Sequence, residues 1–199
     1  MKVEVTALKE LAAFMEAAPE ITPKAASLAM NTIIPRKGMK RYKDAMRGQI
    51  AFPAGYLDDV EKFGVSRLST PSSLEAHITA RQRPTSLARF LTSGAVDQEG
   101  LAVRVKKGRT TTMKRAFLVR LRAGTMMTGE NYNLGVAVRK PGGLTRGKKS
   151  GPMVQLAKDV FLLYGPSVDQ VFRTVSVTET PEVLNEIESE FYRQFGRLA

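Results

Sequence analysis

The stretch Leu101-Ala102-Val103-Arg104-Val105-Lys106 decides the class of the fold, because larger apolar residues at every second position alternate with small or charged ones. This period of two is typical of a β-strand with one buried and one wet face. Residues 116–122 show much of the same alternation, and residues 134–139 are predicted to form another strand. Residues 160–164 form a short apolar run closed by Gly165-Pro166, which predicts a buried strand. The second half of the chain is therefore predicted to be rich in β-strands.

Helical patterns precede this β-rich region. Apolar spacing predicts a first helix over residues 6–18 and a third, strongly basic helix over residues 36–50. Between them, Thr22 is predicted to be the N-cap of a second helix and Pro23 its first residue. Pro35 is expected to end or kink that second helix.

Helical patterns also follow the strands. Ser167 and Gln170 form a capping-box signature for one helix, and Thr180-Pro181 predicts the start of a separate terminal helix. The fold class is thus α+β, with N-terminal helices, a central antiparallel or mixed β-sheet carrying an extended basic hairpin or loop, and a C-terminal helix. We expect a single domain over residues 1–199, from which the basic strands and glycine-rich loop of residues 101–151 extend.

The positive charge of the chain is concentrated in residues 101–150. This quarter holds 13 Lys and Arg against one acid, Glu130, so its net charge equals the +12 of the whole chain. Such a zone indicates a local partner: a phosphate backbone, an acidic protein face or a membrane surface. A solvated surface that aids solubility is the alternative. The candidate contact residues are Arg104, Lys106, Lys107, Arg109, Lys114, Arg115, Arg120, Arg122, Arg139, Lys140, Arg146, Lys148 and Lys149.

The basic residues of segments 104–109 and 114–122 are expected to share one surface. If residues 104–109 and 114–122 belong to neighbouring strands joined near residues 108–113, their charges line one face and repel one another in the isolated subunit. An acidic partner would relieve that repulsion.

Composition narrows the possible functions. The chain has no cysteine, which excludes disulfides and Cys-based zinc sites, and its one histidine excludes a His-based metal cluster. Tryptophan is absent and aromatic residues are few, so a stacking platform for single-stranded nucleic acid has little material. No run approaches the ~18 apolar residues of a membrane span, and the first residues lack a secretory signal pattern. We expect a soluble protein that is not secreted by a standard signal.

Three motifs suggest chemistry, and each has a simpler interpretation. Gly142 and Gly147-Lys148 match a phosphate-binding loop, but Lys149 stands where Ser or Thr should hold Mg²⁺, and no helix pattern follows. We therefore interpret residues 140–151 as a mobile basic loop. His77 reads as an ordinary strand residue, and residues 58–61 with their three acids read as a solvated helix start. The sequence predicts no catalytic residue, cofactor or metal.

The order of these elements resembles the minor tail protein Z family of tailed bacteriophages and prophages, which are tail completion proteins of long-tailed phages. The likeness is specific over residues 103–118 and 160–172. The residues that carry it are Val103-Arg104-Val105-Lys106-Lys107-Gly108, Lys114-Arg115-Ala116-Phe117-Leu118, Leu162-Leu163-Tyr164-Gly165-Pro166-Ser167-Val168 and Phe191-Tyr192-Arg193-Gln194-Phe195. Residues 126–131 and the basic segment 36–47 depart from the family pattern.

The resemblance implies a non-enzymatic virion protein at the head-proximal end of the tail, a neck component that helps to join tail to head. It implies a ring of copies, expected to be hexameric, that contacts tail tube, terminator or head-tail connector proteins. DNA in the channel is a further candidate partner, and no membrane is expected. The protein would lie in the virion tail or neck, and in the host cytoplasm during assembly.

Apolar residues of the last third are the candidates for contacts between copies. They are Phe161, Leu163, Tyr164, Phe172, Phe191 and Phe195. The alternative function is a double-stranded nucleic-acid binding protein that uses the basic residues of the region 101–149.

Overall fold

The computed structural model describes residues 2–4, 14, 16–97, 100–121, 133–139 and 153–199. These residues form an α+β fold, as predicted, in which helices precede and follow most of the antiparallel strands along the chain. Their contacts group into two compact units. Unit 1 comprises Met1–Met46, Gly55–Arg81 and Val168–Ala199, and unit 2 comprises Arg47–Ala54 and Gln82–Ser167. The single folding domain expected from the sequence stays a prediction.

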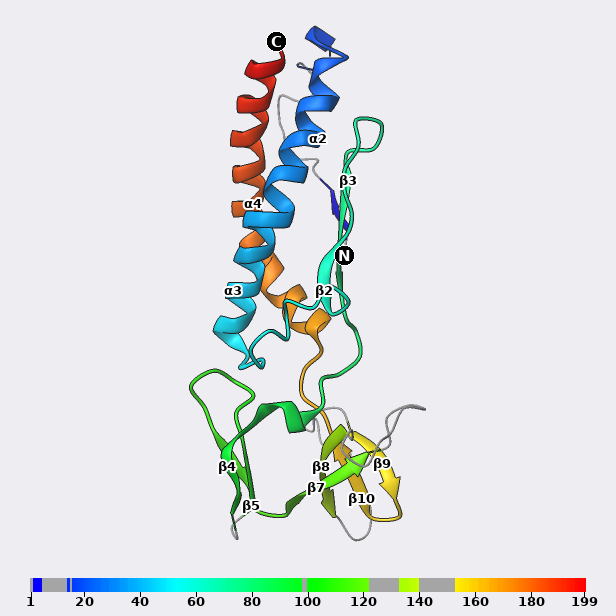
Figure 1. The fold of residues 1–199 in the computed structure, drawn as a ribbon, viewed down its shortest axis with the longest axis vertical. Coiled ribbons are helices and arrows are strands. Elements are labelled where there is room, and N and C mark those ends of the chain that lie inside the picture. Colours follow the sequence, from blue (N-terminus) through cyan, green and yellow to red (C-terminus); the bar gives the residue numbers. More distant parts are fainter. Residues whose placement is uncertain (1, 5–13, 15, 98–99, 122–132, 140–152) are drawn as a thin grey trace. The chain divides into compact units, whose positions relative to one another are not determined.

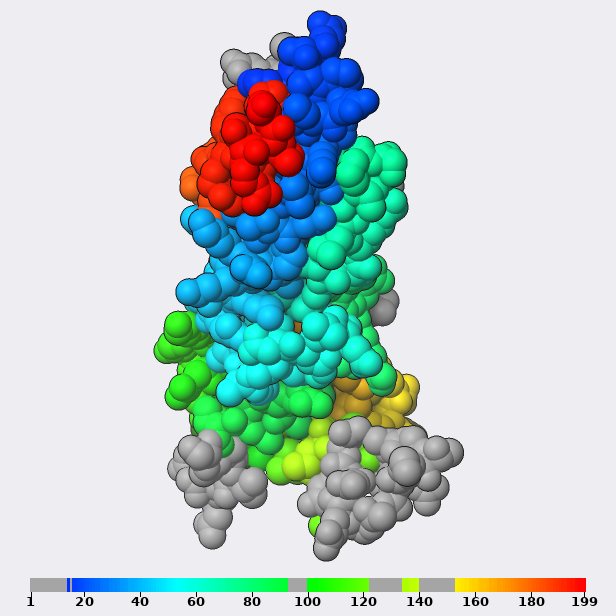
Figure 2. All heavy atoms as spheres, turned by 45° about the horizontal axis from the view of Figure 1, so that its top comes forward, coloured from blue at the N-terminus to red at the C-terminus, as the bar shows by residue number. Residues whose placement is uncertain are grey.

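Unit 1 is built on long helices that lie side by side. They are α2 (Ile21–Ile33), the π-helix η1 (Ile34–Gly38), α3 (Met39–Gln49) and α4 (Val168–Leu198). The α2 helix packs along α4, which runs in the opposite direction (Figure 1). The last turns of α4, in red, lie directly against the blue residues at the start of α2 (Figure 2). There the ring of Phe14 meets those of Phe191 and Phe195 edge-on, with centroids 5.6 and 5.0 Å apart.

A second aromatic cluster closes the core of unit 1 further along the helices. Phe172 of α4 lies 5.1 Å from the ring of Tyr42 in α3 and 4.9 Å from the ring of Phe63, and all three side chains are fully buried. The hydroxyl of Tyr42 lies 3.0 Å from that of Thr180, within hydrogen-bonding distance. Edge-to-face ring pairs add roughly 0.5–1.5 kcal/mol to the area they bury. This cluster therefore fixes α3 against α4.

Pro35 does not end the run of helical residues. The chain passes from α2 through the five-residue π-helix, with Pro35 as its second residue, and directly into α3. Proline has no N–H to donate, and the wider π-turn accommodates that loss. The third helix predicted over residues 36–50 is confirmed as α3.

Two helix starts were predicted wrongly. The α2 helix begins at Ile21, so Thr22 lies inside it, where its hydroxyl donates to the carbonyls of Phe14 and Ala18 at 2.7 and 2.9 Å. Thr180-Pro181 does not start a separate helix either, because α4 is continuous and contains Pro181. Most of the helix predicted over residues 6–18 lies outside the described residues.

The continuity of α4 follows from what it buries. Phe172 and Val175 precede Pro181, and Val183 and Ile187 follow it, all at helical spacing and all buried. Each such burial contributes roughly 1.5–3 kcal/mol. A proline inside a helix costs about 3 kcal/mol, so the packing of this face outweighs it.

A small antiparallel sheet completes unit 1. Its strands are β1 (Lys2–Glu4), β3 (Glu75–Ala80) and β2 (Phe63–Arg67), in the order β1-β3-β2. Ala76 and Ile78 alternate as the buried residues of β3, which also contacts α4. The interpretation of His77 as an ordinary strand residue is thus confirmed.

Unit 2 consists of two antiparallel sheets. One has the order β4-β5-β6, formed by Leu91–Asp97, Gly100–Val103 and Thr111–Met113. The other has the order β7-β8-β10-β9, formed by Ala116–Leu121, Asn133–Arg139, Val160–Leu163 and Met153–Ala157. The strands predicted around residues 116–122, 134–139 and 160–164 are confirmed as β7, β8 and β10. The strand predicted over residues 101–106 is shorter, since β5 ends at Val103.

The core of unit 2 lies between these sheets. Leu101 and Val103 of β5 are buried together with Ala116 of β7 and Val136 of β8. Phe90, at the end of the 3-10 helix η2 (Leu87–Phe90), joins the same cluster. Unit 2 therefore has its own apolar core.

The two basic strands expected to be neighbours lie in different sheets. β5 pairs with β6, and β7 pairs with β8. The physical reason is the short strand β6, which takes the place beside β5 before the chain turns into β7. Gly100 permits close contact at one end of β5: its φ is +123°, and a Cβ atom there would lie 2.4 Å from the Met113 carbonyl oxygen.

Candidate partner-binding surface

The first group of predicted contact residues lies in the connection between β5 and β6. Arg104, Lys106, Lys107 and Arg109 are all exposed. Their backbone is nevertheless held in place, because the N–H of Arg104 donates to the Phe90 carbonyl at 2.8 Å and that of Lys107 donates to Gln49 at 3.1 Å. Residues 50 and 106 also form a β-bridge. The connection thus combines an anchored backbone with solvent-facing cationic side chains.

A tight turn lies between Lys106 and Arg109. The N–H of Arg109 donates to the Lys106 carbonyl at 3.2 Å, and Gly108 between them has a φ of +77°, which favours glycine. The Nε of Arg104 donates to the hydroxyl of Thr110 at 3.3 Å. Thr110, together with residues 111 and 112, is exposed. Cations are therefore followed directly by exposed hydroxyl groups.

The second group begins at the other end of β6. Lys114 and Arg115 are exposed residues of the turn between β6 and β7. We use the name basic strip for the exposed cations and hydroxyls from residue 104 to residue 115. Its members are Arg104, Lys106, Lys107, Arg109, Thr110, Thr111, Thr112, Lys114 and Arg115.

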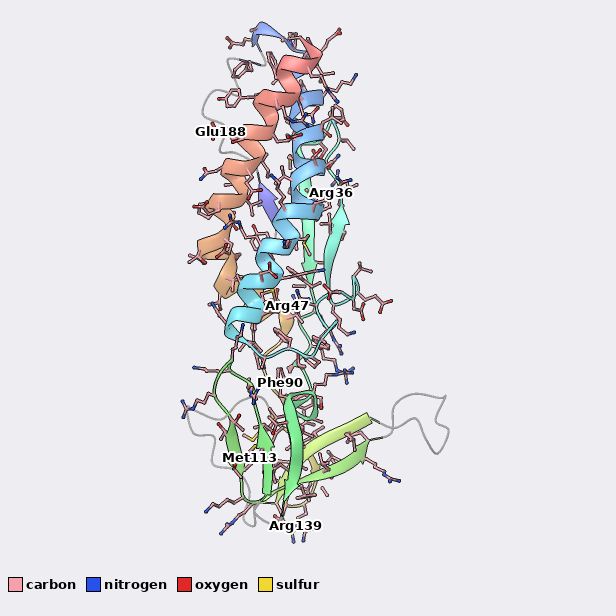
Figure 3. The ribbon with its side chains drawn as sticks, turned by 60° about the vertical axis from the view of Figure 1, so that its left-hand side comes forward. Arg36, Arg47, Phe90, Met113, Arg139 and Glu188 are labelled. Carbon is pink, nitrogen blue, oxygen red and sulfur yellow. The ribbon has the colours of Figure 1, made fainter. Side chains whose placement is uncertain are left out.

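The cations of the basic strip lack carboxylate partners within the described ranges. No ion pair joins any of the six to an Asp or Glu that the structure describes, and the same holds for Arg139 at the end of β8. Figure 3 labels Arg139 and Met113, and shows nitrogen-tipped side chains projecting outward from unit 2. Arg120 is exposed and has an interaction partner. Like charges gathered in this way favour an external partner of opposite sign.

Five of the predicted contact residues lie outside the described residues. They are Arg122, Lys140, Arg146, Lys148 and Lys149. The glycine-rich segment 140–151, with its resemblance to a phosphate-binding loop, lies there as well. The interpretation of that segment as a mobile basic loop stays a prediction.

The predicted contacts between copies lie mostly inside the subunit. Phe172 and Phe191 are 0% and 1% exposed, and Phe161 is also buried. Leu163 packs against the core of unit 2, and Phe195 meets the Phe14 ring edge-on in unit 1. Tyr164 is partly buried, in a β-bridge with Ser86. Most of this apolar area already stabilises the subunit.

An exposed apolar edge that the sequence reading missed lies on β9. Val154 and Leu156 of this strand are 53% and 48% exposed. β9 is the last strand of its sheet within the described part of the chain, so one side of it carries no described partner strand. Proteins usually protect such edges with charge or proline, and an unprotected edge can pair with another strand. The apolar spacing of residues 154 and 156 is the signal that would have indicated it.

The acidic residues and the histidine singled out in the sequence form local pairs. Asp58 accepts from Lys43 at 3.0 Å, and Asp59 accepts from Lys62, which lowers the pKa of the Asp59 carboxyl. His77 lies 3.4 Å from the Glu75 carboxylate. Within the described ranges no three potential metal-ligating residues gather, and none of the described helices has both the length and the apolar character for crossing a membrane.

An open groove in unit 1 has balanced charges. It measures about 460 Å³ and is lined by cations of η1 and α3 and by carboxylates of α3 and α4. Arg41 reaches Glu179 at 3.3 Å and Glu186 at 3.5 Å, and the hydrogen bond that Arg41 donates to Glu179 raises the Arg41 pKa. These charges join α3 to α4, so the groove offers little net charge to a ligand.

Comparisons with protein-family models, curated proteins and solved structures find no match for this chain. The resemblance to the tail-protein family, inferred from residues 103–118 and 160–172, therefore stays a prediction from the sequence. The structure gives these stretches a common neighbour, because β7 and β10 pair with opposite sides of β8. The remaining stretch, residues 191–195, lies on α4 in unit 1.

Proposed function

We propose that this protein is a non-enzymatic structural component of a long-tailed phage or prophage particle, which completes the tail at its head-proximal end and helps to join tail to head. The observation that carries the proposal is the surface of unit 2. It holds a basic strip without described carboxylate partners and an apolar edge strand, β9. Both features favour a protein that binds other macromolecules.

Such a surface is typical of assembly rather than catalysis. Active sites gather a few polar groups in a concave, largely apolar pocket. The basic strip instead places its side chains on turns and on an edge strand, exposed to solvent. An added strand at β9 would gain backbone hydrogen bonds and cover Val154 and Leu156. The partners would be copies of the protein and the tail tube, terminator or head-tail connector proteins.

A ring requires two different contact surfaces on each copy. A heterologous contact, repeated by rotation, closes into a ring, whereas a self-complementary contact stops at a dimer. We propose that β9 provides one of the two surfaces. The expected hexamer matches the sixfold surroundings that the family resemblance implies.

The first test measures self-association of the purified chain by mass photometry. The double variant Val154→Glu/Leu156→Glu should reduce the assembled fraction at least fivefold, because a carboxylate on an apolar edge must be desolvated on pairing. Val177→Glu is the control, since Val177 is 76% exposed on α4 of unit 1. Equal assembly of both variants would rule out β9 as the contact.

The second test uses particles released after prophage induction from the strain that encodes the chain. Deletion of its gene should yield heads and tails that remain separate in electron micrographs, and the wild-type chain should sediment with complete particles. Joined, infectious particles without this protein would contradict the proposed function.

A further inference from the structure

We infer that the basic strip binds the sugar-phosphate backbone of double-stranded nucleic acid without reading its sequence. The inference deepens the proposed function, on which it rests for the setting: DNA that passes through or ends in a ring of these subunits. The binding chemistry itself is carried by residues 104–115 alone.

The donors of the strip are those that phosphate oxygens accept. Arg and Lys side chains, Ser and Thr hydroxyls and backbone N–H groups make most protein contacts to a DNA backbone. The strip offers four cations on one side of β6, two on the other, and exposed Thr111 and Thr112 on the strand between them. β6 is also the end strand of its sheet within the described residues. A run of hydroxyls thus lies between two groups of cations along this segment.

The same composition disfavours an acidic protein as the partner. Protein interfaces have an apolar or aromatic centre and are depleted in Lys. From residue 104 to residue 112 every exposed residue is a cation, a threonine or Gly108, and Val105 is partly buried. The exposed apolar side chains of unit 2 include Val154 and Leu156 on β9 instead. The unit therefore presents one surface suited to phosphates and another suited to protein.

The strip is ordered before any partner binds. The backbone bonds from Arg104 to Phe90 and from Lys107 to Gln49 fix the connection, and the Arg104 guanidinium is held by Thr110. Anchored donors lose less conformational entropy on binding than donors on a free loop. Arg104 is therefore oriented before contact.

The length of β6, which separates the two groups of cations, sets the expected salt dependence. Its three extended residues span about 10 Å, and that length of duplex carries about six phosphates. About half of these face a protein on one side of the duplex, so we expect about three neutralised phosphates. At about −0.9 per phosphate, the logarithm of the binding constant should fall with a slope of about −3 against the logarithm of salt concentration.

No element of the strip is suited to sequence readout. Base edges are read by a helix or strand pair inserted in a groove, commonly through Asn, Gln or Arg that bond two atoms of one base. The strip contains Arg but no Asn or Gln, and its Arg residues lie in the connection and the turn that flank β6, not on a helix that could enter a groove. Affinity should therefore be similar for duplexes of different sequence.

The test measures binding of the full chain to a fluorescently labelled 20-base-pair duplex by anisotropy, over a range of NaCl concentrations. Lys106→Gln/Lys107→Gln/Arg109→Gln removes three charges from the strip. Lys24→Gln/Lys40→Gln/Arg36→Gln removes three exposed charges of the same types from α2, α3 and η1. The strip variant should bind at least tenfold more weakly with a shallower salt slope, and the control variant should lose less than threefold. Equal losses, or no binding by the wild type, would overturn the inference.

A competitor distinguishes phosphate from carboxylate partners. Polyglutamate at the same charge concentration should displace the labelled duplex at least tenfold less effectively than unlabelled duplex does. Equal displacement would assign the strip to an acidic protein face instead. Incorporation of the strip variant into particles reports separately on the proposed function. If the chain is absent from particles, a loss of duplex binding confined to the strip variant still supports the inference.

Discussion

The two units of this protein use charge in opposite ways. Unit 1 holds 14 Lys and Arg against 15 Asp and Glu, a net charge of −1, whereas unit 2 holds 17 against 4, a net charge of +13. In unit 1 described cations and carboxylates meet between elements, as Arg41 does with Glu179 and Glu186. In unit 2 the cations of the basic strip meet no described carboxylate. Charge in unit 1 thus joins parts of the subunit, while the cations of the basic strip in unit 2 are exposed to solvent.

The difference extends to what stabilises each unit. Unit 1 combines aromatic clusters with ion pairs between helices, such as the pairs from Arg41 of α3 to α4. Unit 2 has an apolar core between two sheets and a close glycine contact at Gly100. Removing side chains from unit 2 surfaces should therefore change binding more than stability. The following predictions test this contrast from the largest expected effect to the smallest.

The largest effect is expected in the aromatic core of unit 1. Phe172→Ala should lower the free energy of unfolding by about 3–5 kcal/mol, because it leaves a cavity between the rings of Tyr42 and Phe63. Arg115→Ala, at an exposed position of the basic strip, should change it by less than about 0.5 kcal/mol. Urea denaturation measures both. A cost below 1 kcal/mol for Phe172→Ala would contradict the packing described.

A smaller effect is expected at the glycine contact of unit 2. Gly100→Ala should cost about 2–3 kcal/mol, because φ is +123° and the new Cβ would meet the Met113 carbonyl. Gly48→Ala in α3 is the matched substitution, since no atom lies within 4 Å of its Cβ position. It should stabilise the helix by up to about 1 kcal/mol. Thermal unfolding followed by circular dichroism should show shifts of opposite sign, and shifts of the same sign would refute the assignment.

Low pH should lower the stability of unit 1, because Glu190 becomes protonated. Hydrogen bonds from Arg193, at 2.6 and 2.8 Å, and from Gln194 lower the Glu190 pKa from 4.5 to about 2. Because the folded pKa lies below the unfolded one, ionised Glu190 contributes stability above about pH 4.5 that is lost as the pH falls towards 2. In the Glu190→Gln variant, the free energy of unfolding should therefore fall less steeply with decreasing pH over this range than in the wild type. Glu188→Gln on the same helix is the control. An identical pH dependence of the unfolding free energy in both variants would contradict the stabilising role of the Glu190–Arg193 pair.

The smallest effects on stability should come from exposed charges, and they should differ in sign between the units. Lys106→Gln/Lys107→Gln should raise the melting temperature slightly at low salt, because it relieves repulsion in unit 2. Arg41→Gln should lower it, because Glu179 and Glu186 lose a partner. Both shifts should shrink in 1 M NaCl, where charges are screened beyond about 3 Å. Melting-temperature shifts of the same sign in the two variants would contradict the proposed difference between the charges of unit 1 and unit 2.

The sequence predicts those elements whose signal is local. β7, β8 and β10 follow from their apolar patterns, and α3 follows from its helical spacing. The continuity of α4 does not, because Pro181 is a local break signal and the packing of Val175 and Val183 that overrides it is tertiary. Likewise β6 has only three residues, too few to show a period, so the sequence does not indicate it as the partner of β5.

For the candidate surface, too, the sequence predicts local features but not tertiary contacts. Exposure of the basic side chains of residues 104–115 follows from their charge, and the sequence identifies them correctly as a group on the surface. Their arrangement depends on the anchoring of residue 107 to Gln49, a contact between distant segments that no local pattern encodes. The prediction that apolar residues of the last third form contacts between copies is wrong for a related reason. Large apolar residues such as Phe172 indicate burial, but the sequence does not say whether the burial occurs within one subunit or between two.

The most direct test of the central claim is a cryo-electron microscopy reconstruction of the neck of the assembled particle. The account predicts a ring of this chain at the head-proximal end of the tail, with residues 104–115 of unit 2 nearest to the DNA and β9 in contact with a neighbouring protein strand. A neck without this chain, or a ring in which unit 1 faces the DNA and the basic strip faces solvent, would contradict it.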